Sequence, residues 1–326
     1  MQRAENRSAT WDLGADTTLV RILARNAELL GDHVAMREKH LGIWQETTWA
    51  QMLDATLAFA ASLQSMGFGK EDALLVLGDN RPNLYMGMLA AGALGGYAMP
   101  AYPDATPDEI RHFMHEANAR FVLAEDQEQV DKALDLGEVS SSIEHIIYDE
   151  PRGLASYQHP GLVSWDKLKT RGIERLRAEP SLRKILTENA KPEGPAVFVH
   201  SSGTTGKPKG VVLSHKNILT GVGNAFRGGA FDFGESVLAY LPMAWVGDFA
   251  ITMGAGVALH FVINIPERQE TVLHDLREVA PSFYLAAPRS WDNMLTTIQV
   301  RMEDSTPLKK WLYDVFMNSA LTAERQ

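Results

Sequence analysis

A short stretch of hydroxyl, glycine and lysine residues at positions 201–209 has the composition of a polyphosphate-binding loop. It reads Ser-Ser-Gly-Thr-Thr-Gly-Lys-Pro-Lys. Glycine lets backbone N–H groups turn toward an anion, hydroxyls donate hydrogen bonds to phosphoryl oxygens, and lysine supplies compact positive charge. Apolar runs at 196–199 and 211–213 predict a strand on each side. We therefore expect a phosphate site whose candidate ligands are Ser201, Ser202, Gly203, Thr204, Thr205, Gly206, Lys207 and Lys209.

The spacing within this loop differs from that of a Walker A motif. That motif has four residues between its glycines and continues with Gly-Lys-Ser/Thr. Here two residues separate Gly203 from Gly206, and Pro208 follows Lys207. The alternative interpretation is a flexible surface loop rich in serine, glycine and threonine. The whole string, enclosed by two apolar runs, favours the phosphate site.

The segments that would position the loop alternate between helical and strand patterns. Thr48 and Gln51 match a capping box, and Thr106 with Pro107 and Glu109 marks a second helix start, with its helix running to about residue 117. Further helices are predicted at 164–177, 214–226, 271–279, 290–302 and 307–321. Strands are predicted at 73–77, 121–124, 144–148, 196–199, 237–241, 259–263 and 283–286. This alternation predicts an α/β fold with a mainly parallel sheet.

The composition argues against several classes of function. A net charge of −10 without a basic stripe argues against a nucleic-acid partner. The chain has no cysteine, which excludes disulfides, a cysteine metal site and a cysteine acyl-enzyme. The uncharged, glycine-rich run 84–102 predicts a buried helix leading into a buried strand rather than a membrane span. The absence of cysteine also fits a cytoplasmic protein. Residues 1–7 are polar and no apolar run follows them, so we expect no signal peptide.

The loop resembles the phosphate-binding signature of the adenylate-forming superfamily, which includes acyl-CoA synthetases, luciferases and peptide-synthetase adenylation domains. Other strings resemble the long-chain acyl-CoA synthetase branch and follow that family's order: Gly78-Asp-Asn-Arg-Pro82, Pro100-Ala-Tyr-Pro103, Thr106-Pro-Asp-Glu109, Glu125-Asp-Gln-Glu-Gln-Val130, Leu241-Pro-Met-Ala-Trp-Val246 and Ala287-Pro-Arg-Ser-Trp291. The resemblance implies the N-terminal domain of the adenylate-forming fold, with stacked, mainly parallel sheets and flanking helices, incomplete at its C-terminus. Residues 1–190 would form a first α/β subdomain of the AMP-binding domain. Residues 191–326 would begin a second one, which carries the loop.

The resemblance also implies a reaction and a role for each loop residue. An acid would be activated by ATP as acyl-AMP, and coenzyme A would then take the acyl group as a thioester. The hydroxyls of Thr204 and Thr205, with the backbone around Gly203 and Gly206, would hold the phosphates that leave as pyrophosphate. Lys209 matches the family's loop lysine and would supply charge, so Thr205 and Lys209 are the candidate catalytic residues. Lys207 lies at a position that the family varies and is secondary.

Beyond the loop, Trp245 is a candidate for the site, whereas Asp248 and His215 are not. By the same resemblance, Trp245 lies where this branch places an aromatic or histidine side chain beside the acyl carboxylate; the alternative is an ordinary core tryptophan. Asp248 is interpreted as a solvent-facing or capping carboxylate without a catalytic role. His215 opens the helix after the loop and has no acidic partner in the sequence nearby, so a structural role is favoured over a general base.

Two family segments are not found in this sequence. The resemblance places the magnesium-binding glutamate in a Tyr-Gly-x-Thr-Glu segment, the ribose contact in Thr-Gly-Asp and a catalytic lysine in a small C-terminal lid domain. Neither string occurs here. We therefore expect the chain to bind ATP phosphates without supplying the Mg²⁺ ligand, to lack the lid domain, and to be inactive alone.

Three functions remain open at this point. The first is a long-chain fatty-acid–CoA ligase that uses fatty acid, ATP, Mg²⁺ and CoA. The second is a non-catalytic binding fragment, or half of a split enzyme completed by another chain. The third is an acyl-AMP or aryl-CoA ligase of the same superfamily. A homo-oligomer and peripheral contact with a membrane are further possible associations of such a chain.

Overall fold

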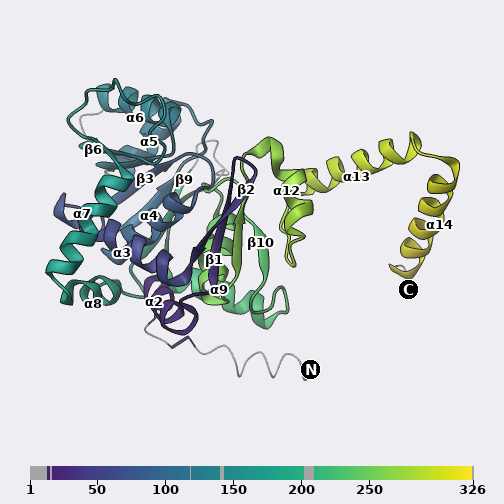
Figure 1. The fold of residues 1–326 in the computed structure, drawn as a ribbon, viewed down its shortest axis with the longest axis horizontal. Coiled ribbons are helices and arrows are strands. Elements are labelled where there is room, and N and C mark those ends of the chain that lie inside the picture. Colours follow the sequence, from purple (N-terminus) through teal and green to yellow (C-terminus); the bar gives the residue numbers. More distant parts are fainter. Residues whose placement is uncertain (1–12, 15–16, 118, 140–142, 202–208, 325–326) are drawn as a thin grey trace. The chain divides into compact units, whose positions relative to one another are not determined.

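The structure is a computed structural model that describes residues 13–14, 17–117, 119–139, 143–201 and 209–324 (Figure 1). The chain divides into two compact units, Met1–Phe283 and Tyr284–Gln326. The predicted subdomain division at residue 190 remains a prediction.

The larger unit contains two sheets. The seven-stranded sheet has the order β7-β6-β5-β3-β4-β8-β9, and the four-stranded sheet has the order β10-β11-β1-β2. All neighbouring pairs are parallel except β8–β9 and β1–β2. The strands are β1 Val34–His40, β2 Ile43–Thr48, β3 Ala73–Leu77, β4 Tyr97–Pro100, β5 Phe121–Ala124, β6 His145–Tyr148, β7 Leu162–Ser164, β8 Pro195–Ser201, β9 Lys209–Ser214, β10 Ser236–Leu238 and β11 Val262–Ile265.

The helices of this unit connect and cover the strands. They are α2 Leu19–Leu30, α3 Trp49–Ser65, α4 Pro82–Ala93, α5 Pro107–Ala117, α6 Gln127–Val139, α7 Trp165–Ala178, α8 Ser181–Glu188, α9 His215–Arg227, α10 Val246–Phe249, α11 Gly256–Ala258 and α12 Val272–Val279, with a π-helix η1 Ala250–Ala255 and a 3₁₀ turn η2 Gln269–Thr271. Both predicted helix starts are confirmed. Thr48 and Gln51 form a reciprocal capping box, and the Glu109 side chain accepts from the Thr106 backbone N–H at 2.8 Å.

The wholly apolar strand β3 is buried on both faces, as its sequence predicts. Leu74 and Val76 join a core formed with α2, α3, α4 and the four-stranded sheet. Leu75 and Leu77 face the opposite way and pack in a second core with α5 and α6. Figure 1 shows α5 and α6 on one side of β3, and α3 and α4 on the other.

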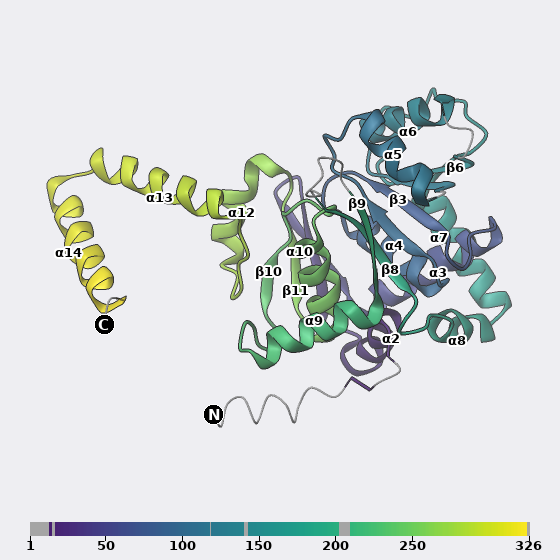
Figure 2. The ribbon, with the colours of Figure 1, turned by 180° about the vertical axis from the view of Figure 1, so that it is seen from behind.

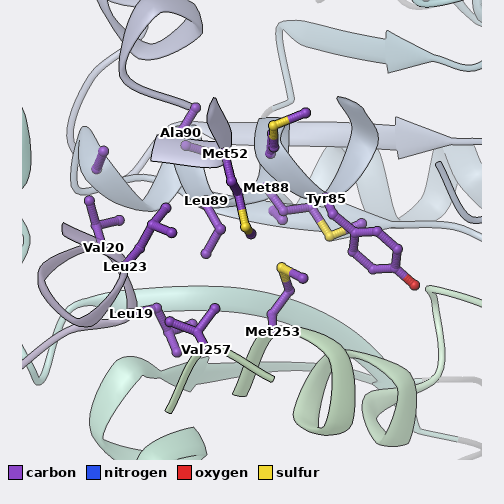
Figure 3. Packing of buried hydrophobic residues seen from close by; sticks show 14 of the residues in the cluster. Leu19, Val20, Leu23, Met52, Tyr85, Met88, Leu89, Ala90, Met253 and Val257 are labelled. Carbon is purple, nitrogen blue, oxygen red and sulfur yellow. The ribbon is translucent and has the colours of Figure 1, made fainter. Parts of the chain in front are cut away.

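Helix α4 covers the first part of the uncharged run 84–102, and β4 lies in its second part. The predicted buried helix and buried strand are therefore confirmed. Methionines belong to the core around α4; Figure 3 shows Met88 beside Tyr85, with Met52 and Met253 nearby. No helix among the described residues is both long enough and apolar enough to cross a bilayer.

Three strand predictions need correction. Residues 283–286 form no strand. Phe283 makes an isolated β-bridge to Val237, and its side chain packs against the core, which accounts for the apolar residue at this position. The strand predicted at 259–263 begins at Val262, because α11 ends at Ala258 and His260 turns the chain at φ +60°. The strand predicted at 237–241 is β10 alone, Ser236–Leu238.

The smaller unit contains two helices, α13 Pro288–Glu303 and α14 Pro307–Glu324. Both were predicted, within a few residues of these bounds. The rings of Tyr284 and Trp291 meet edge to face, with centroids 5.4 Å apart. Large apolar side chains are exposed along both helices, among them Trp291, Trp311 and Phe316.

Candidate functional site

The predicted phosphate loop connects two paired antiparallel strands. β8 and β9 pair from Pro195 opposite Ser214 to Ser201 opposite Lys209, with a register shift between Pro195 and Val197. Figure 2 shows β8 beside β9, which is the edge strand of the seven-stranded sheet. Residues 202–208 join the two strands and lie outside the described residues. The predicted strands on both sides of the loop are therefore confirmed. The assignments to phosphates remain predictions for Ser201, Ser202, Gly203, Thr204, Thr205, Gly206, Lys207 and Lys209, as do the catalytic roles of Thr205 and Lys209.

The first residue after Lys209 has a steric reason to be glycine. A Cβ atom on Gly210 would lie 2.0 Å from Cζ of Phe198, so the Phe198 ring occupies the place of a side chain. The ring of Phe198 also meets His200 edge to face, with centroids 5.3 Å apart. Sequence reasoning did not single out Gly210, although a glycine directly after the loop is the available signal.

The loop leaves β8 at the carboxyl edge of the parallel strands, since β8 pairs in parallel with β4. Ligands of open α/β sheets bind at this edge. A cavity of about 450 Å³ lies there, lined by Tyr102, Ile110 and His200 among others. Burial lowers the pKa of His200 to about 4, so its imidazole is neutral near pH 7.

Charged residues follow the neighbouring strands β3, β5 and β6 at the same edge. Nε of Arg81 lies 2.8 Å from Oε1 of Glu125, whose other oxygen accepts from the Asp79 backbone N–H at 2.6 Å. Burial raises the pKa of Glu125, and the Arg81 charge opposes that shift. Burial also raises the pKa of Asp149 to about 6, although Asn83 donates to it at 2.6 Å. A polar cavity of about 550 Å³ is lined by Arg81, Asn83, Glu125 and Asp149, among others.

Trp245 immediately precedes α10. Residues 239–244 connect it to the end of β10. The residue is 39% exposed, which argues against an ordinary core tryptophan. The indole passes over Gly247, where a Cβ atom would lie 2.4 Å from Cζ3 of the ring. Contact with an acyl carboxylate remains a prediction for this residue.

Asp248 does not face solvent, so its interpretation as a solvent-facing carboxylate is wrong. The residue is 2% exposed, and its Oδ2 accepts from the Tyr85 hydroxyl at 2.8 Å. Burial raises the pKa of the carboxyl to about 7, against hydrogen bonds from Tyr85, Thr252 and Asn80 that lower it. No local pattern predicts these contacts, because Tyr85 lies 163 residues away from Asp248.

His215 is a buried residue of the helix packing, in agreement with the favoured structural role. Its Nδ1 accepts from the Leu19 backbone N–H at 3.5 Å, and burial lowers its pKa to about 4. A Cβ atom on Gly92 would lie 3.2 Å from Cε1 of the imidazole, so the glycine lets α4 approach α9 closely.

One side-chain cluster of the described residues brings together groups that could ligate a metal. It consists of His274, Asp275 and Glu278 on α12. Nζ of Lys39 lies 2.8 Å from Asp275 and 2.5 Å from Glu278, so both carboxylates already hold a cation. These residues do not fit a Mg²⁺ site, and α12 lies far from β8 and β9 in the sequence.

Comparisons with known proteins agree with this architecture. The chain is 27% identical to the long-chain-fatty-acid–CoA ligase ACSBG2 of Rattus norvegicus over 313 residues, which is 90% of this chain and 44% of that protein. The chain thus spans less than half of this relative. Among solved structures, the A-PCP didomain of a carboxylic acid reductase from Segniliparus rugosus, in complex with AMP, has a TM-score of 0.76 at 16% identity; the match covers 96% of this chain and 47% of that one.

A second solved structure shares this fold. The luciferase-like enzyme from the mealworm Zophobas morio has a TM-score of 0.67 at 18% identity, over 83% of this chain and 60% of that one. The predicted adenylate-forming fold is therefore confirmed. The family of AMP-binding enzymes matches residues 23–324, which is nearly the whole chain. From its sequence and its fold, this chain belongs to the AMP-binding enzyme family.

Proposed function

We propose that this chain carries the ATP-phosphate and acyl-carboxylate sites of a long-chain fatty-acid–CoA ligase. In the first step a carboxylate oxygen of the fatty acid attacks the α-phosphorus of ATP. The bond from that phosphorus to pyrophosphate breaks, and acyl-AMP forms. In the second step the sulfur of CoA attacks the acyl carbonyl carbon, and AMP leaves with the bonding electrons. CoA supplies the thiol, since the chain has no cysteine.

The observation that carries the proposal is the β8–β9 hairpin in a chain of this family. Its strands bring Ser201 and Lys209 opposite each other at the carboxyl edge of the sheet, and the seven residues between them have a phosphate-binding composition. The relatives named as long-chain-fatty-acid–CoA ligases support the fatty-acid substrate.

Transfer of a nucleotidyl group asks a protein mainly for positioning and for neutralisation of charge. We assign the β- and γ-phosphates to Thr204, Thr205 and the adjacent backbone, and the compensating charge to Lys209. Trp245 would border the acyl carboxylate, where an indole can contact both an apolar chain and a polar head group. Mg²⁺, when bound, adds positive charge at the phosphates. We assign it no ligand within this chain.

The test is calorimetric titration of the chain with ATP and Mg²⁺, for the native sequence and for a Thr205→Ala, Lys209→Ala variant. Hydrogen bonds to charged groups contribute about 1.5–3 kcal/mol each, so we expect the variant to bind ATP at least about tenfold more weakly. Lys184→Ala is the matched control, because it removes one exposed lysine on α8. Its affinity should equal that of the native chain.

A folded native chain without measurable ATP affinity would overturn the proposal, as would equal affinities in native chain and loop variant. Pyrophosphate release with medium- and long-chain fatty acids then measures whether the chain adenylates alone. We expect no release, since neither Tyr-Gly-x-Thr-Glu nor Thr-Gly-Asp occurs in the sequence. Acid-dependent release that the loop variant abolishes would contradict this expectation while supporting the site assignment.

A further inference from the structure

The turn that carries Trp245 cannot hold its position by local contacts alone. α10 has four residues, and the Trp245 side chain does not cap it. A single helical turn is unstable in isolation. Two backbone hydrogen bonds shape the segment, from the Trp245 N–H to the Pro242 carbonyl at 2.9 Å and from the Asp248 N–H to the Trp245 carbonyl at 3.0 Å. The position of the indole therefore depends on what anchors this segment to the rest of the protein.

A buried polar network supplies that anchor. We call Asn80, Tyr85, Asp248 and Thr252 the Asp248 network; each of the four is at most 3% exposed. The Asn80 amide donates to the Tyr85 hydroxyl at 2.5 Å, and that hydroxyl donates to Oδ2 of Asp248 at 2.8 Å. The same amide donates to the Leu241 carbonyl at 2.9 Å, four residues before Trp245. The network thus makes hydrogen bonds to the Trp245 segment on both sides of the indole, at Leu241 before it and at Asp248 after it.

The anchors of the network are themselves fixed. The ring of Tyr85 lies in the methionine-rich core, and Figure 3 shows its hydroxyl oxygen pointing away from Met88 and Met253. On the other side, the Thr252 hydroxyl donates to the Asp248 backbone carbonyl at 2.6 Å. Thr252 belongs to the π-helix η1, a conformation that occurs frequently at functional sites.

We propose that Asp248 is the positioning residue for Trp245: its bonds to the Asp248 network hold the indole where the acyl carboxylate binds. The acyl role of Trp245 rests on the proposed function above; the positioning does not. Asn80 follows β3 of the seven-stranded sheet, whereas Leu241 follows β10 of the four-stranded sheet. The network therefore ties the two sheets together beside the candidate acyl site.

The charge on Asp248 sets the strength of the hydrogen bonds that hold the Trp245 segment in place. From α4 the carboxyl faces the titratable hydroxyl of Tyr85, whose pKa burial raises well above its usual value. From the end of β3 and from η1 it faces the neutral side chains of Asn80 and Thr252. No ion pair among the described residues includes Asp248. A charged carboxylate accepts more strongly from Tyr85 than a protonated one, so the turn responds to the ionisation of this one group.

The experiment follows the environment of Trp245 by fluorine NMR of the chain labelled with 5-fluorotryptophan. Trp245→Phe identifies one of the seven tryptophan resonances. In the native chain we expect this resonance to shift on titration with a midpoint near pH 7, where Asp248 ionises. The resonance of Trp165, which is stacked on Phe59 at 4.0 Å, is the internal control and should not follow that titration.

Two variants decide whether Asp248 is the cause. In Asp248→Asn the Trp245 resonance should become independent of pH. In Tyr85→Phe the carboxylate loses a hydrogen bond that lowers its pKa, so the midpoint should move to higher pH. A merely structural role would produce neither change. A Trp245 resonance that ignores pH in the native chain, or that titrates equally in Asp248→Asn, would overturn the proposal.

Binding of a fatty acid separates this inference from the proposed function. If the resonance titrates as expected and Asp248→Asn weakens fatty-acid binding severalfold near pH 8, the positioning inference and the acyl assignment are both supported. If the resonance titrates as expected but the native chain binds no fatty acid, positioning of Trp245 stands and the acyl assignment fails. If binding is present but the Trp245 resonance does not titrate, the positioning inference fails alone.

Discussion

Replacement of Asp248 by asparagine removes a buried carboxyl whose charge is stabilised only by neutral donors among the described residues. Burial raises its pKa from 3.8 to about 7 in the folded protein. Between these two values the folded chain holds a proton that the unfolded chain has lost. Because the folded state binds more protons there, this group makes the native chain less stable as the pH rises from about 4 to about 7.

The magnitude follows from the size of the shift. Each pKa unit corresponds to about 1.4 kcal/mol, so a shift of about three units corresponds to roughly 4 kcal/mol across the window. An asparagine does not ionise, so it contributes no such pH dependence. One of its amide hydrogens would, however, face the Asn80 amide nitrogen, which lies 3.4 Å from Oδ1 of Asp248 in the native chain. An unsatisfied buried donor costs about 1–3 kcal/mol. We therefore expect Asp248→Asn to be less stable than the native chain near pH 4 and more stable, by about 1–3 kcal/mol, near pH 8.

The assay is urea unfolding followed by circular dichroism, for both chains at about one-unit steps from about pH 4 to about pH 8. The measured quantity is the difference in the free energy of unfolding at each pH. Asp149→Asn serves as the comparison. The pKa of Asp149 is raised to about 6, so the difference in the free energy of unfolding between this variant and the native chain should stop changing about one pH unit lower. A difference for Asp248→Asn that stays constant within about 0.5 kcal/mol from pH 5 to pH 8 would refute the reasoning.

Two further predictions concern packing and association. A Cβ atom on Gly172 would lie 1.7 Å from the Ala58 carbonyl oxygen, so Gly172→Ala should lower the free energy of unfolding by about 3 kcal/mol in urea titrations. Gly221→Ala, whose Cβ would meet nothing within 4 Å, should instead leave stability equal or raise it by about 0.5 kcal/mol; equal losses in both variants would contradict the steric argument. Trp311 and Phe316 are 59% and 69% exposed on α14, so we expect the chain to associate as concentration rises in sedimentation velocity. Lysine at both positions should shift it toward the monomer, and an unchanged distribution would exclude α14 as the contact surface.

The elements that sequence reasoning predicted are those with local signals. Thr48 and Thr106 make hydrogen bonds three residues along the chain, which a sequence displays directly. The hairpin β1–β2 was missed because its strands carry an ordinary surface composition. Lys39 is buried there only because Asp275, 236 residues later, accepts from it. Its burial is decided by tertiary packing, which the local pattern does not contain.

The candidate site was predictable to the same extent. Composition and spacing identified the loop, and the strands around it agree. Trp245 was identified through the family resemblance, but its exposure and its contact with Gly247 needed the structure. The position of Asp248 beside Tyr85 depends on how β10 and β3, which lie in different sheets, come together. Neither periodicity nor propensity carries that information.

One string that resembles the family acquires a physical meaning from these contacts. Residues 78–82 leave β3 at the carboxyl edge of the sheet. Gly78 adopts φ +140°, and a Cβ atom there would lie 2.3 Å from Cβ of Glu125, so no other residue fits without displacement. Two positions later, Asn80 bonds to the Leu241 carbonyl of the Trp245 turn. A substitution at Gly78 should therefore disturb Trp245 as well as β3, because the same short segment that ends the strand also supports the neighbouring sheet.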